Sequence, residues 1–129
     1  MIRKIKGTGV ALVTPFKSDL TVDFRALTSL VNRCIDSNVD FLVVIGTTGE
    51  SATLSLEEKN AVLECIKNAN KNRLPIILGI GGNNTDYIIQ SFSSYNLDGV
   101  DAILSVSPAY NKPTQEGIYQ HFKAISESS

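Results

Sequence analysis

The stretch Phe41-Leu42-Val43-Val44-Ile45-Gly46-Thr47-Thr48-Gly49-Glu50-Ser51 decides the fold. Its first five residues are apolar and rich in β-branched side chains, which is typical of a buried parallel strand. Glycine follows at once and permits a sharp turn and a close approach to a ligand, because it has no Cβ. Two threonine hydroxyls beside exposed backbone N–H groups suit a carboxylate or phosphate. The stretch predicts a strand that ends in an anion-binding turn, and an ordinary strand-to-helix connection is the alternative.

The same order of strand, polar turn and helix occurs four times along the chain. We expect strands at residues 8–13, 40–45, 75–80 and 100–106. Helices should follow at about 23–36, from 55 to 70, from 84 or 85, and from 113, because apolar residues recur there at spacings of three and four. Ser55-Leu56-Glu57-Glu58 has the form of a capping box. The residues that we expect on the buried helix faces are Phe24, Leu27, Leu30, Val31, Cys34, Ile35, Val62, Cys65, Ile66, Ala69, Ile88, Ile89, Phe92, Ile118, Phe122 and Ile125.

Four consecutive βα units predict an α/β fold with a parallel sheet, because parallel neighbours need crossover connections. Two architectures fit a single domain over residues 1–129. One is the first four βα units of a (β/α)₈ TIM barrel, a half barrel, since a whole barrel needs roughly 250 residues. The other is an open, flavodoxin-like parallel sheet. Small and hydroxyl residues follow all four expected strands, at the end where both architectures bind ligands.

Composition excludes several classes of function. The net charge is −1 and basic residues do not cluster, so we expect no nucleic-acid partner. No apolar run approaches the length of a membrane span, and none behind the basic start is long enough for a secretory signal, so we expect no membrane partner. Cys34 and Cys65 lie within helical apolar patterns and are interpreted as core residues in a reducing, cytoplasmic compartment.

Nucleotide and metal sites also lack support in the sequence. The glycines of residues 79–84 lack the third glycine of the dinucleotide fingerprint, and no Gly-Lys-Ser/Thr follows any glycine loop. His121 is the single histidine and has no acidic or cysteine cluster at ligand spacing, so we interpret it as a partly exposed helix residue. We therefore expect neither a metal nor a cofactor.

Tyr110 is the remaining candidate for chemistry. It follows the fourth expected strand, in a turn that Asn111, Lys112 and Pro113 lead toward a helix. Its hydroxyl suits proton transfer if another hydroxyl is its partner. Packing over the barrel mouth or an interface is an equally good interpretation.

Two segments carry a family resemblance: residues 46–54, Gly-Thr-Thr-Gly-Glu-Ser-Ala-Thr-Leu, and residues 107–122, Ser-Pro-Ala-Tyr-Asn-Lys-Pro-Thr-Gln-Glu-Gly-Ile-Tyr-Gln-His-Phe. They closely resemble the dihydrodipicolinate synthases (4-hydroxy-tetrahydrodipicolinate synthases), which are pyruvate-dependent class I aldolases with a (β/α)₈ barrel. The similarity extends over essentially the whole chain, including residues 8–16.

The resemblance implies a lyase of lysine and diaminopimelate biosynthesis. Pyruvate forms an imine (Schiff base) with a lysine, and the resulting enamine attacks L-aspartate 4-semialdehyde. Thr48 would hold the pyruvate carboxylate with its hydroxyl and backbone N–H, beside Thr47. Thr47 would also belong to a proton relay, which Tyr110 would complete by reaching into a neighbouring subunit. The implied assembly is a tight homodimer, and a tetramer in the complete enzyme.

The sequence also departs from the family pattern. In the family the imine lysine lies at the sixth strand, and a relay tyrosine and an arginine follow the fifth, whereas these residues end in the fourth helix. We expect the 129 residues alone to lack synthase activity, since no lysine, Lys112 included, shows signs of a buried amine. A half barrel would leave its first and fourth strands as exposed edges. A non-catalytic half barrel acting as a binding or scaffold subunit is the alternative function.

A feedback site for lysine is the last feature that the resemblance suggests. Ser51, Ala52 and Asn83 match the allosteric pocket of lysine-inhibited members. The family positions that carry histidine and glutamate in those members are occupied here by Leu56, Lys59 and Tyr87. We therefore expect weak or absent inhibition by lysine.

Overall fold

Four parallel strands form the sheet of this computed structural model, which describes residues 5–128. They are β1 (Gly9–Ala11), β2 (Phe41–Val44), β3 (Ile76–Gly79) and β4 (Ala102–Leu104), and they lie side by side in chain order. Each strand falls inside its predicted range and is shorter at both ends. A flavodoxin-like sheet reverses its strand order at a switch point, so that alternative is wrong, and the order is that of a (β/α)₈ barrel.

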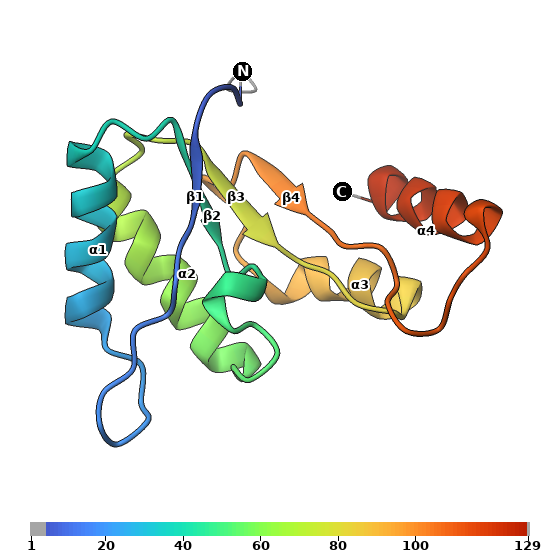
Figure 1. Cartoon of the computed structure of the whole chain (residues 1–129), viewed down its shortest axis with the longest axis horizontal. Coiled ribbons are helices and arrows are strands. Elements are labelled where there is room, and N and C mark those ends of the chain that lie inside the picture. The colour runs from blue at the N-terminus through green and yellow to red at the C-terminus, as the bar shows by residue number, and fades with distance from the viewer. Residues whose placement is uncertain (1–4, 129) are drawn as a thin grey trace.

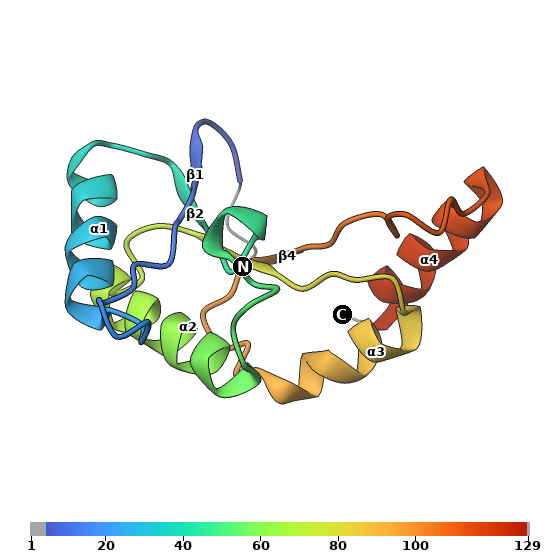
Figure 2. The same cartoon turned by 60° about the horizontal axis from the view of Figure 1, so that its bottom comes forward.

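Four helices connect and follow the strands (Figure 1): α1 (Phe24–Asp36), α2 (Leu56–Asn70), α3 (Thr85–Ser91) and α4 (Gln115–Ser128). Two short 3₁₀ turns, η1 (Thr47–Gly49) and η2 (Phe92–Ser94), follow β2 and α3. Figure 2 shows the helices succeeding one another in an arc on one side of the sheet. This is expected of right-handed crossovers that join neighbouring parallel strands in sequence. No helix within residues 5–128 has the length and apolar character needed to cross a membrane.

The predicted helix starts are fixed by side-chain caps. The Ser55 hydroxyl accepts the Glu58 N–H at 3.2 Å, and the Glu58 carboxylate accepts the Ser55 N–H at 2.8 Å, which confirms the capping box. Asp23 caps α1 and Asn84 caps α3 in the same way, each accepting one backbone N–H of the first turn. These bonds satisfy N–H groups that have no partner within the helix.

The core lies between the sheet and the helices. On the two central strands, the residues that point toward the helices are at most 1% exposed: Leu42, Val44, Ile76 and Leu78. Two predicted core residues are wrong, because Phe24 and Phe122 are exposed. Four others are half-buried and pack against the core: Leu30, Ile35, Cys65 and Ile89. Phe24 occupies the first position of α1, and α4 directs His121 and Ile125 rather than Phe122 into its contact with α3.

His121 differs most from its predicted environment. It is 4% exposed, and its Nδ1 lies 2.8 Å from the Thr85 hydroxyl at the start of α3. The interpretation as a partly exposed residue is therefore wrong. The polar imidazole ring can be buried here because the Thr85 hydroxyl is a hydrogen-bond partner for one of its nitrogens.

The opposite face of the sheet is the concave side of the arc. Strand register places Ala11, Val43, Ile77 and Ala102 in one row across it. None of the four is fully buried, whereas the helix-side residues of the two central strands are. Val13, Leu104 and Val106, nearer the carboxyl ends of the outer strands, are 46–50% exposed. Within the described residues β1 and β4 are the edge strands, as predicted for a half barrel.

Candidate functional site

The η1 turn is built directly on the end of β2. The Gly49 N–H donates to the Gly46 carbonyl and the Glu50 N–H to the Thr47 carbonyl, both at 3.0 Å. Glu50 then leaves the turn in the left-handed conformation, with φ of 57°. The predicted anion-binding turn is thus a tight 3₁₀ turn at the carboxyl end of a buried strand, the position where parallel sheets place functional groups.

Ile45, immediately before the turn, is backbone-strained. Its φ is 57°, a region that β-branched residues rarely adopt. The strand beside it carries Gly79, and a Cβ built there would lie only 2.4 Å from the Ile45 carbonyl oxygen. The absence of a side chain at Gly79 therefore makes room for the bend that aims the Thr47–Thr48 turn.

Thr14 holds the other side of the turn and was not predicted as a functional residue. It is 5% exposed, and its hydroxyl donates to the Gly49 carbonyl at 2.7 Å. This bond ties η1 to the loop that follows β1. The signal in the sequence was weak: a threonine in a loop after a strand, on the same edge as Gly49.

The two threonines at the centre of the prediction carry free hydroxyls. Thr47 and Thr48 are both exposed, and neither hydroxyl has a hydrogen-bond partner among residues 5–128. A hydroxyl of this kind can donate to a carboxylate and accept from a second hydroxyl. The turn therefore places two adjacent, exposed threonines immediately after the carboxyl end of β2.

Tyr110 is not brought to Thr47 within the chain. Its side chain is 98% exposed and its φ is 70°. Its loop is held by Asn83, whose amide donates to the Ala109 carbonyl at 3.0 Å and accepts the Ala109 N–H at 2.9 Å. This pair of bonds imitates strand pairing between the loops that follow β3 and β4. The loop is thus anchored next to a tyrosine that points entirely into solvent.

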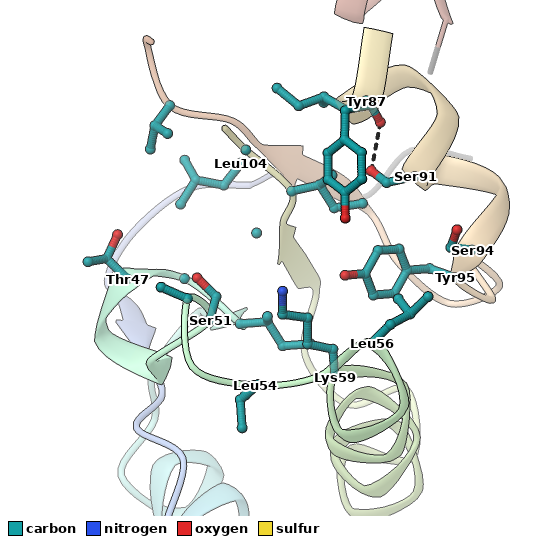
Figure 3. A pocket seen from close by; sticks show the side chains of 18 of the residues that line it. Thr47, Ser51, Leu54, Leu56, Lys59, Tyr87, Ser91, Ser94, Tyr95 and Leu104 are labelled. Carbon is teal, nitrogen blue, oxygen red and sulfur yellow. Dashed lines mark hydrogen bonds between the residues drawn. The ribbon is translucent and has the colours of Figure 1, made fainter. Parts of the chain in front are cut away.

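A cavity of about 570 Å³ lies between η1, the start of α2, helix α3 and the ends of β3 and β4 (Figure 3). Thr47, Ser51 and Ala52 contribute to its wall. The other polar side chains that line it are Lys59, Tyr87, Gln90, Ser91, Ser94 and Tyr95. Asn83 is not among the lining residues, so the structure brings together two of the three residues predicted for a regulatory pocket.

Tyr95 is the titratable group of this cavity whose protonation is clearly perturbed. Burial raises the pKa of its hydroxyl, and the nearby Tyr87 raises it further. Both effects favour the neutral form, because desolvation and a second negative phenolate each disfavour charge. At neutral pH Tyr95 is therefore a hydrogen-bond donor.

Residues 5–128 contain no group of three or more histidine, cysteine, aspartate or glutamate side chains that could hold a metal ion. Cys34 and Cys65 are both free thiols. Burial raises the pKa of Cys34, which keeps it in the unreactive thiol form. The polar side chains of the cavity wall are hydroxyls, one amide and one lysine.

Comparison with known proteins gives a consistent result. The sequence model of the dihydrodipicolinate synthetase family matches residues 4–129. The 4-hydroxy-tetrahydrodipicolinate synthase of Flavobacterium psychrophilum is 58% identical over 123 residues, which is 95% of this chain and 42% of that protein. The chain thus spans less than half the length of this curated relative.

Two solved structures show the same relation. The dihydrodipicolinate synthase of Acinetobacter baumannii, solved with pyruvate, is 45% identical with a TM-score of 0.91 over 98% of this chain and 43% of its own. A monomeric variant of a dihydrodipicolinate synthase is 38% identical with a TM-score of 0.89 over 95% of this chain and 41% of its own. The four βα units therefore correspond to part of such a barrel.

Proposed function

The chain belongs to the dihydrodipicolinate synthetase family, and from this premise we propose that it supplies the first four βα units of a 4-hydroxy-tetrahydrodipicolinate synthase. In that enzyme pyruvate forms an imine with a lysine of the remaining barrel. The enamine then attacks L-aspartate 4-semialdehyde, and the product enters lysine and diaminopimelate biosynthesis in the cytoplasm. The observation that carries the proposal is the pair of unpartnered hydroxyls, Thr47 and Thr48, on the strained turn after β2.

Thr48 binds the pyruvate carboxylate in this proposal. A carboxylate accepts hydrogen bonds only, so it needs donors that are already oriented. The Thr48 hydroxyl and backbone N–H lie on a turn that Gly46, Gly49 and Thr14 hold in place. Orienting the substrate in this way lowers the entropy cost of reaching the transition state.

Thr47 and Tyr110 form a proton relay between subunits. Imine formation and dehydration move protons on and off oxygen and nitrogen, and a chain of hydroxyls can carry them. Tyr110 is 98% exposed on a loop held by Asn83, a geometry that suits insertion into the site of a second copy. The active assembly is therefore a tight dimer, extended to a tetramer in the complete enzyme.

The 129 residues alone carry no imine lysine in this proposal and have no synthase activity. Lys112 lies on the Tyr110 loop and is exposed, so it lacks the desolvated pocket that activates an imine-forming lysine. Ser51, Ala52 and Asn83 belong to a regulatory region, and lysine inhibits weakly because Lys59 and Tyr87 offer no carboxylate to a second amine.

The test is a fused barrel in which residues 1–129 replace the matching part of the Flavobacterium psychrophilum relative. We expect Thr48→Val to raise the KM for pyruvate more than it lowers kcat. Thr47→Val and Tyr110→Phe should lower kcat by about 10²–10⁴-fold, the range of general acid–base effects. Thr28→Val is the matched control, since Thr28 lies on α1 and its hydroxyl bonds the Phe24 carbonyl. Equal, small effects of all four variants would refute the assigned roles.

A further inference from the structure

Thr14 is a buried polar side chain at the carboxyl edge of the sheet. It is 5% exposed, and its hydroxyl donates to the carbonyl of Gly49, which is buried as well. A buried hydroxyl or carbonyl that lacks a hydrogen bond is costly, so each of the two groups depends on the other. Valine has nearly the same shape and would fill this position without a polar group. The hydroxyl at position 14 therefore indicates a role for the bond itself rather than for packing alone.

The bond acts on the peptide group that joins Gly49 to Glu50. This group carries the Gly49 carbonyl, which accepts the Thr14 hydroxyl at 2.7 Å. It also carries the Glu50 N–H, which donates to the Thr47 carbonyl at 3.0 Å. One hydrogen bond thus reaches the loop after β1, 35 positions away, and the other closes the η1 turn on itself. Both polar atoms of one peptide are fixed, and Thr48 lies between the two anchored residues, Thr47 and Gly49.

Local backbone preference alone would not hold this peptide in place. Glu50 has a φ of 57°, in the left-handed region that residues with a Cβ rarely adopt. A flip of the peptide changes ψ of Gly49 and φ of Glu50 together, and Gly49 has no Cβ to resist it. The flip would relieve Glu50, but it would break both hydrogen bonds and turn the Gly49 carbonyl away from Thr14. The two bonds therefore maintain a strained turn, and Thr14 supplies the one that comes from outside it.

We propose that Thr14 is a positioning residue of the pyruvate site, whose hydroxyl keeps the Gly49–Glu50 peptide in the orientation that presents Thr48 to the carboxylate. This role rests on the proposed function of the turn. Thr14 has no direct contact with pyruvate in this proposal, because its side chain is buried and its hydroxyl proton is used by Gly49. Without the bond, only a fraction of the molecules holds the turn ready at any time. The apparent affinity for pyruvate falls by that fraction, whereas the chemical steps after binding keep their rate.

Steady-state kinetics of the fused barrel, with pyruvate as the varied substrate, tests this role. Thr14→Val removes the hydroxyl at nearly constant shape. We expect it to raise KM about tenfold, the effect of one lost hydrogen bond, with kcat within about twofold of the parent. Thr14→Ser keeps the hydroxyl and should hold KM within about twofold of the parent. In combination with Thr48→Val, Thr14→Val should raise KM by less than the product of the two single effects, because both act on the same contact.

Circular dichroism of each variant shows whether the fold is retained. If Thr14→Val does not fold, Thr14→Cys carries the test, because a thiol of similar size is only a weak donor. We expect Thr14→Cys to raise KM with kcat unchanged, and an unchanged KM would overturn the proposal.

Thr53→Val is the matched control, because it removes a threonine hydroxyl from the same loop. That hydroxyl donates to the Glu50 carbonyl at 3.0 Å, in the next peptide group along the chain, and the Thr53 N–H donates to the same carbonyl. The control should leave KM unchanged. A lowered Tm with unchanged KM in Thr14→Val would show that Thr14 contributes to stability alone, and would overturn the proposal. So would a serine variant as impaired as the valine variant, or independent effects of Thr14→Val and Thr48→Val.

The Thr48→Val variant separates this role from the proposed function. An unchanged KM in Thr48→Val would overturn the proposed function of the turn, and the role of Thr14 with it. A raised KM in Thr48→Val beside an unchanged KM in Thr14→Val would overturn the role of Thr14 alone.

Discussion

Replacing Gly79 with alanine perturbs the contact that holds the bend before η1. A Cβ at this position would lie 2.4 Å from the Ile45 carbonyl oxygen and 2.8 Å from the Ile45 carbonyl carbon. Both are backbone atoms, so no side-chain rotamer can relieve the overlap, and β3 must move away from the end of β2. Overpacking costs about 1–3 kcal/mol, and the backbone contact places this case near the upper end, about 3 kcal/mol.

Thermal unfolding followed by circular dichroism measures the effect. For a domain of this size we expect Gly79→Ala to lower Tm by roughly 10 °C, at about 3–4 °C per kcal/mol. Gly46→Ala, at the start of the η1 turn itself, is the matched control, because a Cβ there meets only Val43 Cγ1, at 3.7 Å. The Tm of that variant should lie within a few degrees of the Tm of the parent chain. Equal Tm values for the two variants would refute the reasoning.

Three further predictions concern named contacts. Asn70→Ala should lower the free energy of unfolding in urea by about 2–4 kcal/mol, because Asn70 is 1% exposed and its amide makes two bonds to the Leu74 backbone; a change under 1 kcal/mol would contradict this. Ser55→Ala should cost about 1 kcal/mol through loss of the capping box, and Ser55→Asp should restore most of it. The raised pKa of Tyr95 stabilises the fold below about pH 10, its unfolded value, and this contribution is lost as pH rises through the folded pKa. Tyr95→Phe should therefore flatten the alkaline fall in Tm, and an unchanged profile would assign that fall to other groups.

Local patterns were sufficient to predict the elements of the fold. The apolar run before Gly46 and the Ser55–Glu58 capping box depend on neighbouring residues, and both predictions are confirmed. The parallel sheet followed from four consecutive βα units, because parallel neighbours need crossover connections. The strand order then decided between the two architectures that the sequence left open. The strands were predicted too long at both ends, because the apolar pattern continues into loops that no longer form hydrogen bonds with the neighbouring strand.

Contacts between distant residues could not be predicted in this way. The Thr14 hydroxyl reaches a carbonyl 35 positions away, and His121 bonds Thr85 at a separation of 36. No helical or strand periodicity encodes such partners. The family resemblance pointed to part of the cavity wall, but Gln90, Ser94 and Tyr95 were not predicted, because each resembles an ordinary surface residue until the fold brings them together.

The most direct test of the proposed division of the site is imine trapping with pyruvate and borohydride. The 129-residue chain is mixed with the complementary part of the Flavobacterium psychrophilum relative, and intact masses are measured. We predict a pyruvyl adduct on the complementary chain alone, formed more slowly when the 129-residue chain carries Thr48→Val and at the parent rate when it carries Thr28→Val. An adduct on the 129-residue chain would contradict the account. So would an adduct that forms at the parent rate when the 129-residue chain carries Thr48→Val.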